Sequence, residues 1–101
     1  MKKIINSKLY DTETAKEIGS TYNGLNCGDS SYCEEKLYLK KTGEFFLYGE
    51  GGPMTKYGRA VGDGYAWGES IVPIDIADAK KWVQENLDVE TYVNLFGVVE
   101  E

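Results

Sequence analysis

Cys27 and Cys33 are the residues of this chain whose type and spacing come closest to a metal site. Thiolates are good zinc ligands, and a carboxylate from Asp29 or Asp11 could extend the set. Five residues separate the two cysteines, whereas the usual zinc motif has about two to four, and the sequence contains no histidine. We therefore favour two free thiols over a structural zinc site. A disulfide is the least favoured of the three alternatives in a reducing cytoplasm.

Catalytic groupings are scarce elsewhere in the sequence. The lack of histidine removes the commonest general base and any Ser–His or Cys–His pair. Gly49–Pro53 is rich in glycine, but it lacks the Lys and Ser or Thr that complete a phosphate-binding loop. The many carboxylates, Glu34 and Glu35 among them, are expected to be solvated, because nothing in the sequence brings a chosen two to one cleft. We predict a binding protein rather than an enzyme.

The charge balance limits the kind of partner. The 101 residues include 11 Lys and Arg against 17 Asp and Glu, which gives a formal net charge of -6. Because Arg59 is the one arginine, the chain has little with which to grip phosphates, and we expect no direct contact with nucleic acid. An acidic surface is a common aid to solubility, but it also favours basic partners and speeds encounter with them.

The amino-terminal residues do not continue as a targeting segment. Lys2 and Lys3 with the isoleucines after them resemble the start of a signal peptide, but no apolar stretch follows Asn6. No part of the sequence has the length and apolar composition of a membrane span. We therefore expect the protein to stay in the cytoplasm where it is made, away from membranes, and we take it to be a monomer.

Strands are the elements expected to position these residues in the first half of the chain. Apolar and polar residues alternate through Glu34–Pro53 on both sides of a Lys41–Glu44 turn, which is typical of a β-hairpin. Leu37 and Leu39 share one face of the first strand. Apolar side chains occupy both faces of the second strand, Phe45–Tyr48, so this strand should be central in a sheet.

Flanking segments predict further strands. Ile4–Tyr10 is expected to be a tight hairpin around Asn6 and Ser7, although glycine suits the second turn position better than serine does. Lys16–Tyr22 predicts another strand, and Asn23–Gly24 predicts a reversal of the chain after it.

Gly49–Gly68 holds seven of the 12 glycines and is predicted to be too flexible for regular structure. It nevertheless carries large apolar side chains, at Met54, Tyr57, Tyr65 and Trp67. A segment with this composition must either fold back on the sheet or contact a partner.

Two helices are expected after a strand at Ser70–Ile74. Asp75 and Asp88 are suitable capping residues, and Gly97 ends the second pattern. Each helix has apolar residues at helical spacing, at Ile76, Ala79, Val83 and Leu87 in the first and at Val89, Tyr92, Val93 and Phe96 in the second. The sequence thus predicts an α+β fold, with an antiparallel sheet of four to five strands covered on one face by two C-terminal helices, as a single domain over residues 1–101.

The whole pattern resembles a small domain carried by phages and mobile elements of Firmicutes. That domain occurs in several type II-A anti-CRISPR proteins, which inhibit the RNA-guided CRISPR nuclease of the host. The resemblance spans nearly the whole chain but not the segment from Cys27 to Cys33, and it is carried by Lys8–Ile18, Glu35–Tyr38, Phe46–Pro53, Trp82–Asn86 and Phe96–Gly97.

The resemblance implies stoichiometric inhibition of a type II-A CRISPR effector nuclease. Such a nuclease holds nucleic acid in a basic channel and recognition lobe, so an acidic domain bound there would prevent target DNA from loading. The alternative is an accessory or regulatory module of a phage or mobile element that binds another protein. By chemical type, the residues expected to contact the partner are Asp29, Glu34, Glu35, Glu50, Asp63 and Glu69, with Tyr57 and Trp67 as apolar anchors.

Overall fold

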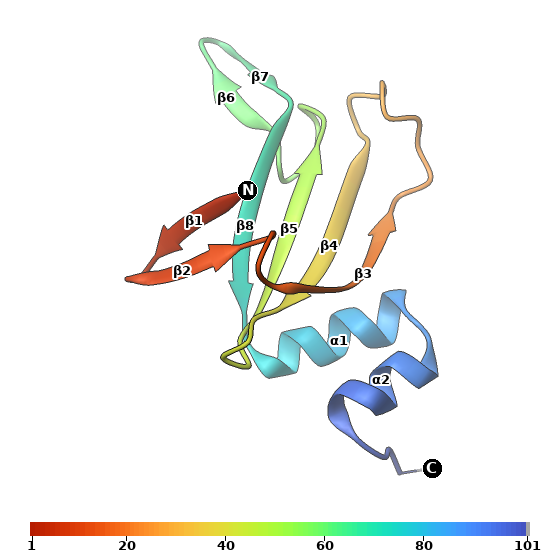
Figure 1. Ribbon diagram of the computed structural model, residues 1–101. Coiled ribbons are helices and arrows are strands. Elements are labelled where there is room, and N and C mark those ends of the chain that lie inside the picture. The colour runs from red at the N-terminus through yellow and green to blue at the C-terminus, as the bar shows by residue number, and fades with distance from the viewer. Residues whose placement is uncertain (101) are drawn as a thin grey trace.

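The fold is built around a four-stranded antiparallel sheet (Figure 1). It is described from a computed structural model in which residues 1–100 are placed. The strand order is β3–β4–β5–β8, and these strands span Lys16–Tyr22, Cys33–Leu39, Phe45–Gly51 and Gly68–Ile74. Two C-terminal helices follow, α1 at Ile76–Asn86 and α2 at Val89–Phe96. The predicted α+β fold with an antiparallel sheet and two C-terminal helices is confirmed.

Two separate hairpins extend from this framework (Figure 1). One consists of β1 and β2, Lys2–Ile5 and Lys8–Asp11, and the other of β6 and β7, Arg59–Val61 and Gly64–Ala66.

The predicted turn between β4 and β5 is confirmed, because the Lys40 amide donates to the Glu44 carbonyl over 2.9 Å.

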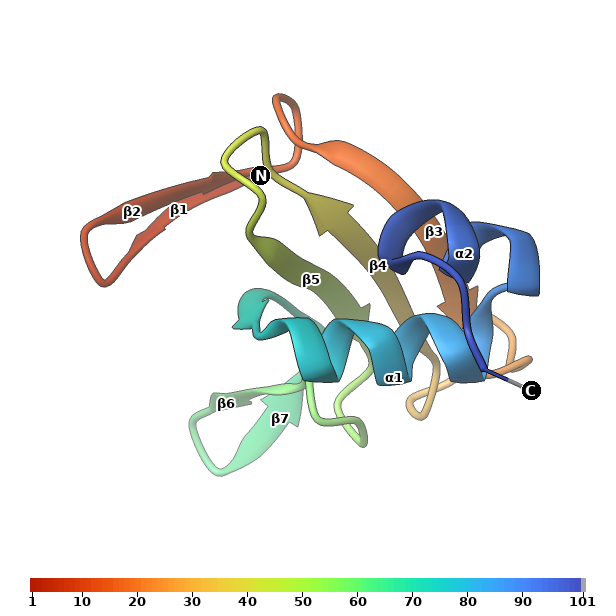
Figure 2. The ribbon, with the colours of Figure 1, turned by 90° about the horizontal axis from the view of Figure 1, so that it is seen from below.

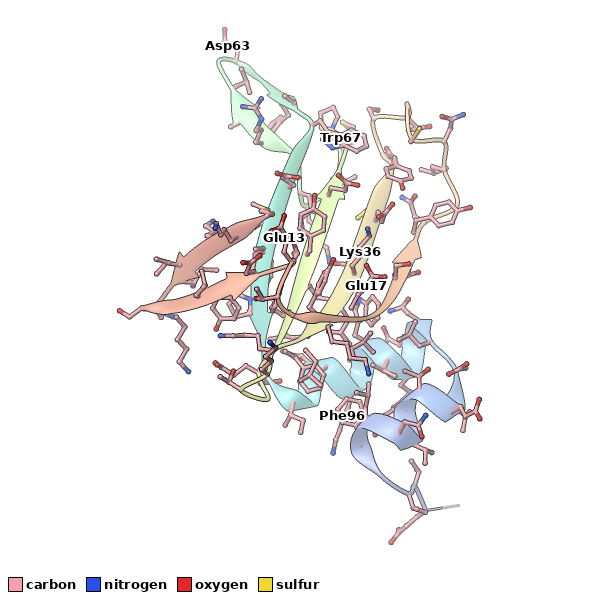
Figure 3. All side chains as sticks on the ribbon, in the orientation of Figure 1. Glu13, Glu17, Lys36, Asp63, Trp67 and Phe96 are labelled. Atoms are coloured by element: carbon pink, nitrogen blue, oxygen red, sulfur yellow. The ribbon has the colours of Figure 1, made fainter. Side chains whose placement is uncertain are left out.

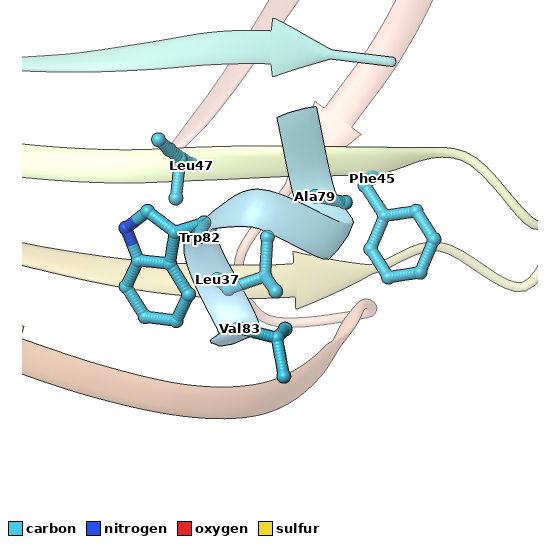
Figure 4. Close-up of a cluster of buried hydrophobic side chains, with 6 residues drawn as sticks. All are labelled: Leu37, Phe45, Leu47, Ala79, Trp82 and Val83. Carbon is cyan, nitrogen blue, oxygen red and sulfur yellow. The ribbon is translucent and has the colours of Figure 1, made fainter. Parts of the chain in front are cut away.

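The helices cover one face of the sheet, and β1–β2 lies on the other (Figure 2). On the helix-covered face, side chains of β4 and β5 pack against α1, with Leu37 and Val83 fully buried. α2 adds Phe96, whose ring centroid lies 5.7 Å from that of Phe45. Figure 4 shows the six buried residues of this core, which are Leu37, Phe45, Leu47, Ala79, Trp82 and Val83.

A second, smaller core lies on the opposite face, beneath β1–β2. Tyr10 of β2 meets Phe46 edge to face with centroids 5.5 Å apart, and Tyr38 stacks on Phe46 at 5.2 Å. Ile71 of β8 completes this cluster.

The part of the same face beyond β1–β2 carries mainly polar and aromatic side chains. We call it the open face and define it by Tyr22, Glu34, Lys36, Tyr48, Glu50, Trp67 and Glu69.

The prediction that Gly49–Gly68 lacks regular structure is wrong. β5 continues to Gly51, and β6 and β7 pair inside the segment. A Cβ on Gly49 would overlap the Tyr57 ring, and one on Gly68 would overlap the Tyr57 carbonyl oxygen. Glycine is needed at these two positions because Tyr57 approaches the sheet backbone too closely for a side chain. The two glycines therefore provide space for Tyr57 and not backbone flexibility.

The helix caps are as predicted, but the apolar stripes are only partly buried. Asp75 accepts a hydrogen bond from the Asp78 amide and Asp88 accepts one from the Thr91 amide, each over 2.8 Å. The inclusion of Ile76 and Val89 among core-facing positions is wrong, because their side chains are 59% and 80% exposed. Both are the first residue of a helix and lie outside the packed turns.

The β1–β2 turn should be improved by glycine. Asn6 and Ser7 both have positive φ, 51° and 66°, a conformation that is unfavourable for serine. Ser7→Gly should therefore raise the free energy of unfolding by about 0.5–1 kcal/mol, measured by urea denaturation. Ser7→Ala keeps the Cβ and serves as the control without a gain. A Ser7→Gly variant no more stable than the natural chain would contradict this account of the turn.

Candidate functional site

Neighbouring glutamates on β4 lie in two different environments. Side chains alternate between the faces of a strand, so Glu34 and Glu35 point to opposite sides of the sheet. Glu35 faces the helix-covered side, where it contacts α1 and the loop after β5. Glu34 faces the open side, where β5 and β8 place further carboxylates beside it.

Glu35 is a largely buried carboxylate held by three donors from two parts of the chain, α1 and the loop after β5. Its side chain is 13% exposed. The indole Nε1 of Trp82 donates to Oε1 over 3.2 Å, and the Lys56 ammonium lies 2.9 Å from Oε2. The hydroxyl of Tyr57 also donates to Oε2. Glu35 thereby joins β4 to α1 and to the loop that carries Tyr57.

The protonation states of this group are fixed at neutral pH. Burial raises the pKa of Glu35, but the hydrogen bonds from Tyr57, Lys56 and Trp82 outweigh it and leave the pKa below its usual value. Burial and the bond to Glu35 raise the pKa of the Tyr57 hydroxyl well above its usual value. The carboxylate is thus ionised and the hydroxyl protonated, which fits a structural contact rather than proton transfer.

Three glutamates stand side by side across the open face. In the register of the sheet, Glu34 of β4 lies directly opposite Glu50 of β5, and Glu50 lies directly opposite Glu69 of β8. We call these three residues the carboxylate row. Like charges directly opposite one another destabilise a sheet, so this arrangement costs folding free energy.

Among residues 1–100, the groups that contact the carboxylate row are tyrosine hydroxyls and the ammonium of Lys36. Tyr32 donates to Glu34 over 2.6 Å, and Tyr48 donates to Glu69 over 2.5 Å. The bond to Glu34 raises the pKa of Tyr32 to about 12, and burial followed by the bond to Glu69 raises that of Tyr48, so both hydroxyls stay protonated. Lys36 is 3.8 Å from Glu34 and 3.9 Å from Glu17, so its single charge is shared.

An aromatic stack borders the carboxylate row at the end of the sheet far from the helices. The Tyr32 ring lies between Trp67, with centroids 5.6 Å apart and planes inclined by 15°, and Tyr22, at 6.2 Å. Tyr32 is buried, whereas Tyr22 is 61% and Trp67 39% exposed. Figure 3 labels Trp67 at this end, with Lys36 and Glu17 further along the sheet. The open face therefore combines negative charge with exposed aromatic surface.

The structure brings together four of the eight residues predicted to contact a partner, namely Glu34, Glu50, Trp67 and Glu69. Glu35 and Tyr57 lie on the other face and contact each other, so Tyr57 is buried in the chain itself and is not exposed to a partner. Asp29 lies in the loop between β3 and β4, where it accepts from the Ser31 amide. Asp63 lies at the tip of the β6–β7 hairpin (Figure 3).

The predicted zinc ligands are not gathered. Cys27 is exposed, Cys33 is half-buried, and both are free thiols. The Asp11 carboxylate accepts from the Glu13 amide in the turn after β2, and Asp29 is engaged by Ser31. Within residues 1–100, no three Cys, Asp or Glu side chains are grouped as metal ligands. The structure therefore adds no fit for zinc, and the site stays a prediction from sequence.

Comparisons with family models, with curated proteins and with solved structures find no match to this chain. Of the helices in residues 1–100, none has the length and apolar character needed to cross a membrane.

Replacement of Glu35 should change both stability and its pH dependence. Glu35→Gln loses the ion pair with Lys56 and one acceptor, so it should lower the free energy of unfolding by about 2 kcal/mol at neutral pH. Because folding lowers the pKa of Glu35 from 4.5, its stabilisation is present above pH 4.5 and is lost as the pH falls through the folded pKa. Urea denaturation at a series of pH values should show the two proteins converging below pH 4.5.

The matched control is Glu85→Gln, which removes one charge from an exposed residue of α1. It should leave stability nearly unchanged over the same pH range. A constant difference between Glu35→Gln and the natural chain at every pH would contradict an ionised Glu35 as the stabilising species.

Proposed function

We propose that the open face is a protein-binding surface, and that the chain uses it to bind and inhibit a type II-A RNA-guided CRISPR nuclease. The observation that supports this proposal best is the carboxylate row, Glu34, Glu50 and Glu69. Departures from local rules of sheet stability concentrate at functional sites, because a partner and not the fold compensates for them. A partner with positive charges over the row would relieve its repulsion.

The chemistry of the open face suits a basic protein surface. Glu17, Glu34, Glu50 and Glu69 place four negative charges on or beside it. Lys36 lies among them, and the guanidinium of Arg59 donates to the Trp67 carbonyl over 3.1 Å at the border of the face. A type II nuclease holds its guide and target in a positively charged channel. An acidic sheet face bound in that channel, in the cytoplasm of the host bacterium, would exclude target DNA by occupying the same surface.

The open face is also held in place before any partner binds. Its strands are anchored from behind by the helix-covered core, and tyrosine hydroxyls orient Glu34 and Glu69. Preorganised side chains lose little conformational entropy on association, so more of the interaction free energy appears as affinity. Inhibition by binding then needs about one equivalent of the protein, whereas an enzyme would act far below the amount of its target.

The proposal predicts opposite effects on stability and on inhibition from one change. Glu50→Gln combined with Glu69→Gln removes repulsion across β5 and β8, so the free energy of unfolding should stay the same or rise by up to about 1 kcal/mol. In a titration of DNA cleavage by the guide-loaded nuclease, half inhibition should need about tenfold more of this variant, or more still. A gel shift should show target DNA loading blocked by the natural chain.

The control for net charge is Asp78→Asn combined with Glu85→Gln, two exposed carboxylates of α1 on the opposite side of the sheet. This control should inhibit as well as the natural chain does. Inhibition lost equally in both double variants would show that net charge and not the open face matters. No inhibition of any of several nuclease orthologues would favour the accessory module instead.

A further inference from the structure

The exposed rings beside the carboxylate row indicate which basic side chain the open face accepts. We propose that it binds an arginine-rich segment of its partner in preference to a lysine-rich one. This inference rests on the proposed function only in taking the partner to be a basic protein.

The aromatic stack offers flat, partly desolvated surface next to negative charge. Tyr32 fixes Trp67 and Tyr22 on either side of it, and these two outer rings are the exposed ones. A guanidinium is planar and weakly hydrated, so it stacks on such rings, whereas an ammonium is compact and strongly hydrated. Stacking therefore adds to the charge attraction for arginine more than for lysine.

The central carboxylate of the row has acceptor capacity to spare. Glu34 and Glu69 each receive a short bond from a tyrosine hydroxyl, of 2.6 Å and 2.5 Å. Glu50 lies 3.4 Å from the Tyr48 hydroxyl, whose single proton is donated to Glu69 over the shorter distance. None of the ion pairs found in residues 1–100 involves Glu50. A carboxylate with both oxygens accessible can accept two parallel bonds from one guanidinium, which an ammonium cannot supply in that geometry.

The row is long enough to take two arginines from alternate positions of an extended segment. Adjacent strands are about 4.8 Å apart, so Glu34 and Glu69, two strands apart, are separated by about 10 Å. Alternate side chains on one side of an extended peptide are about 6.5–7 Å apart. Two arginines spaced in this way reach from the stack across the row, with the residue between them pointing away.

The test uses two capped peptides of equal length and charge, one alternating arginine with glycine and the other alternating lysine with glycine. Calorimetric titration at low salt should show the arginine peptide binding the natural chain about two- to fivefold more tightly. Trp67→Ala should remove this preference and Trp67→Tyr, which keeps a ring, should retain it. Glu50→Gln should weaken both peptides.

Equal affinity for the two peptides, or no binding of either, would overturn the inference. The outcome is separable from that of the proposed function, because inhibition of the nuclease is measured independently. Equal affinity with inhibition retained would remove the arginine preference and leave the proposed function in place. Arginine preference without inhibition of any nuclease would support the inference and remove the nuclease as the partner.

Discussion

The rest of the structure depends on the contacts that the buried Glu35 carboxylate makes with Trp82, Tyr57 and Lys56. It ties the middle of β4 to Trp82 of α1 and to Tyr57 in the loop after β5. With Tyr57 held there, the ring packs on the sheet backbone at Gly49, and the start of β8 passes beside it at Gly68. The position of β8 next to β5 is thereby supported from the helix-covered side, and that position is what adds a third glutamate to the open face.

Negative charge has opposite effects on stability on the two faces of β4. On one face, a single carboxylate has three donors, one of them an ammonium, and its charge stabilises the fold. On the other, three carboxylates share two tyrosine hydroxyls and one ammonium, which lies 3.8 Å from Glu34, and their mutual repulsion opposes folding. The first arrangement is explained by stability alone. The second is not explained by stability, and under our proposal a positively charged partner would relieve its repulsion.

Local features of this fold could be predicted from the sequence, whereas the pairing of distant segments could not. The strands outside the glycine-rich segment, the Lys41–Glu44 turn and both aspartate caps follow from alternation, turn chemistry and capping, whereas β6 and β7 do not. Counting six residues back from Lys40 and six forward from Glu44 even places Glu34 opposite Glu50. Nothing local brings Glu69 beside them or folds Tyr57 onto the sheet, because both depend on contacts across the glycine-rich segment. For the same reason, composition alone predicts flexibility at glycines that in fact allow Tyr57 to approach the sheet.

The two tryptophans of the chain allow the most direct test of the open face as the binding surface. Trp67 lies on the open face, and Trp82 of α1 is buried on the other side of the sheet. With both replaced by fluorotryptophan, fluorine NMR of the protein bound to the guide-loaded nuclease reports on each side separately. We expect the chemical shift of Trp67 to change on binding and that of Trp82 to stay the same. Full inhibition of the nuclease with the Trp67 resonance unchanged would contradict the account.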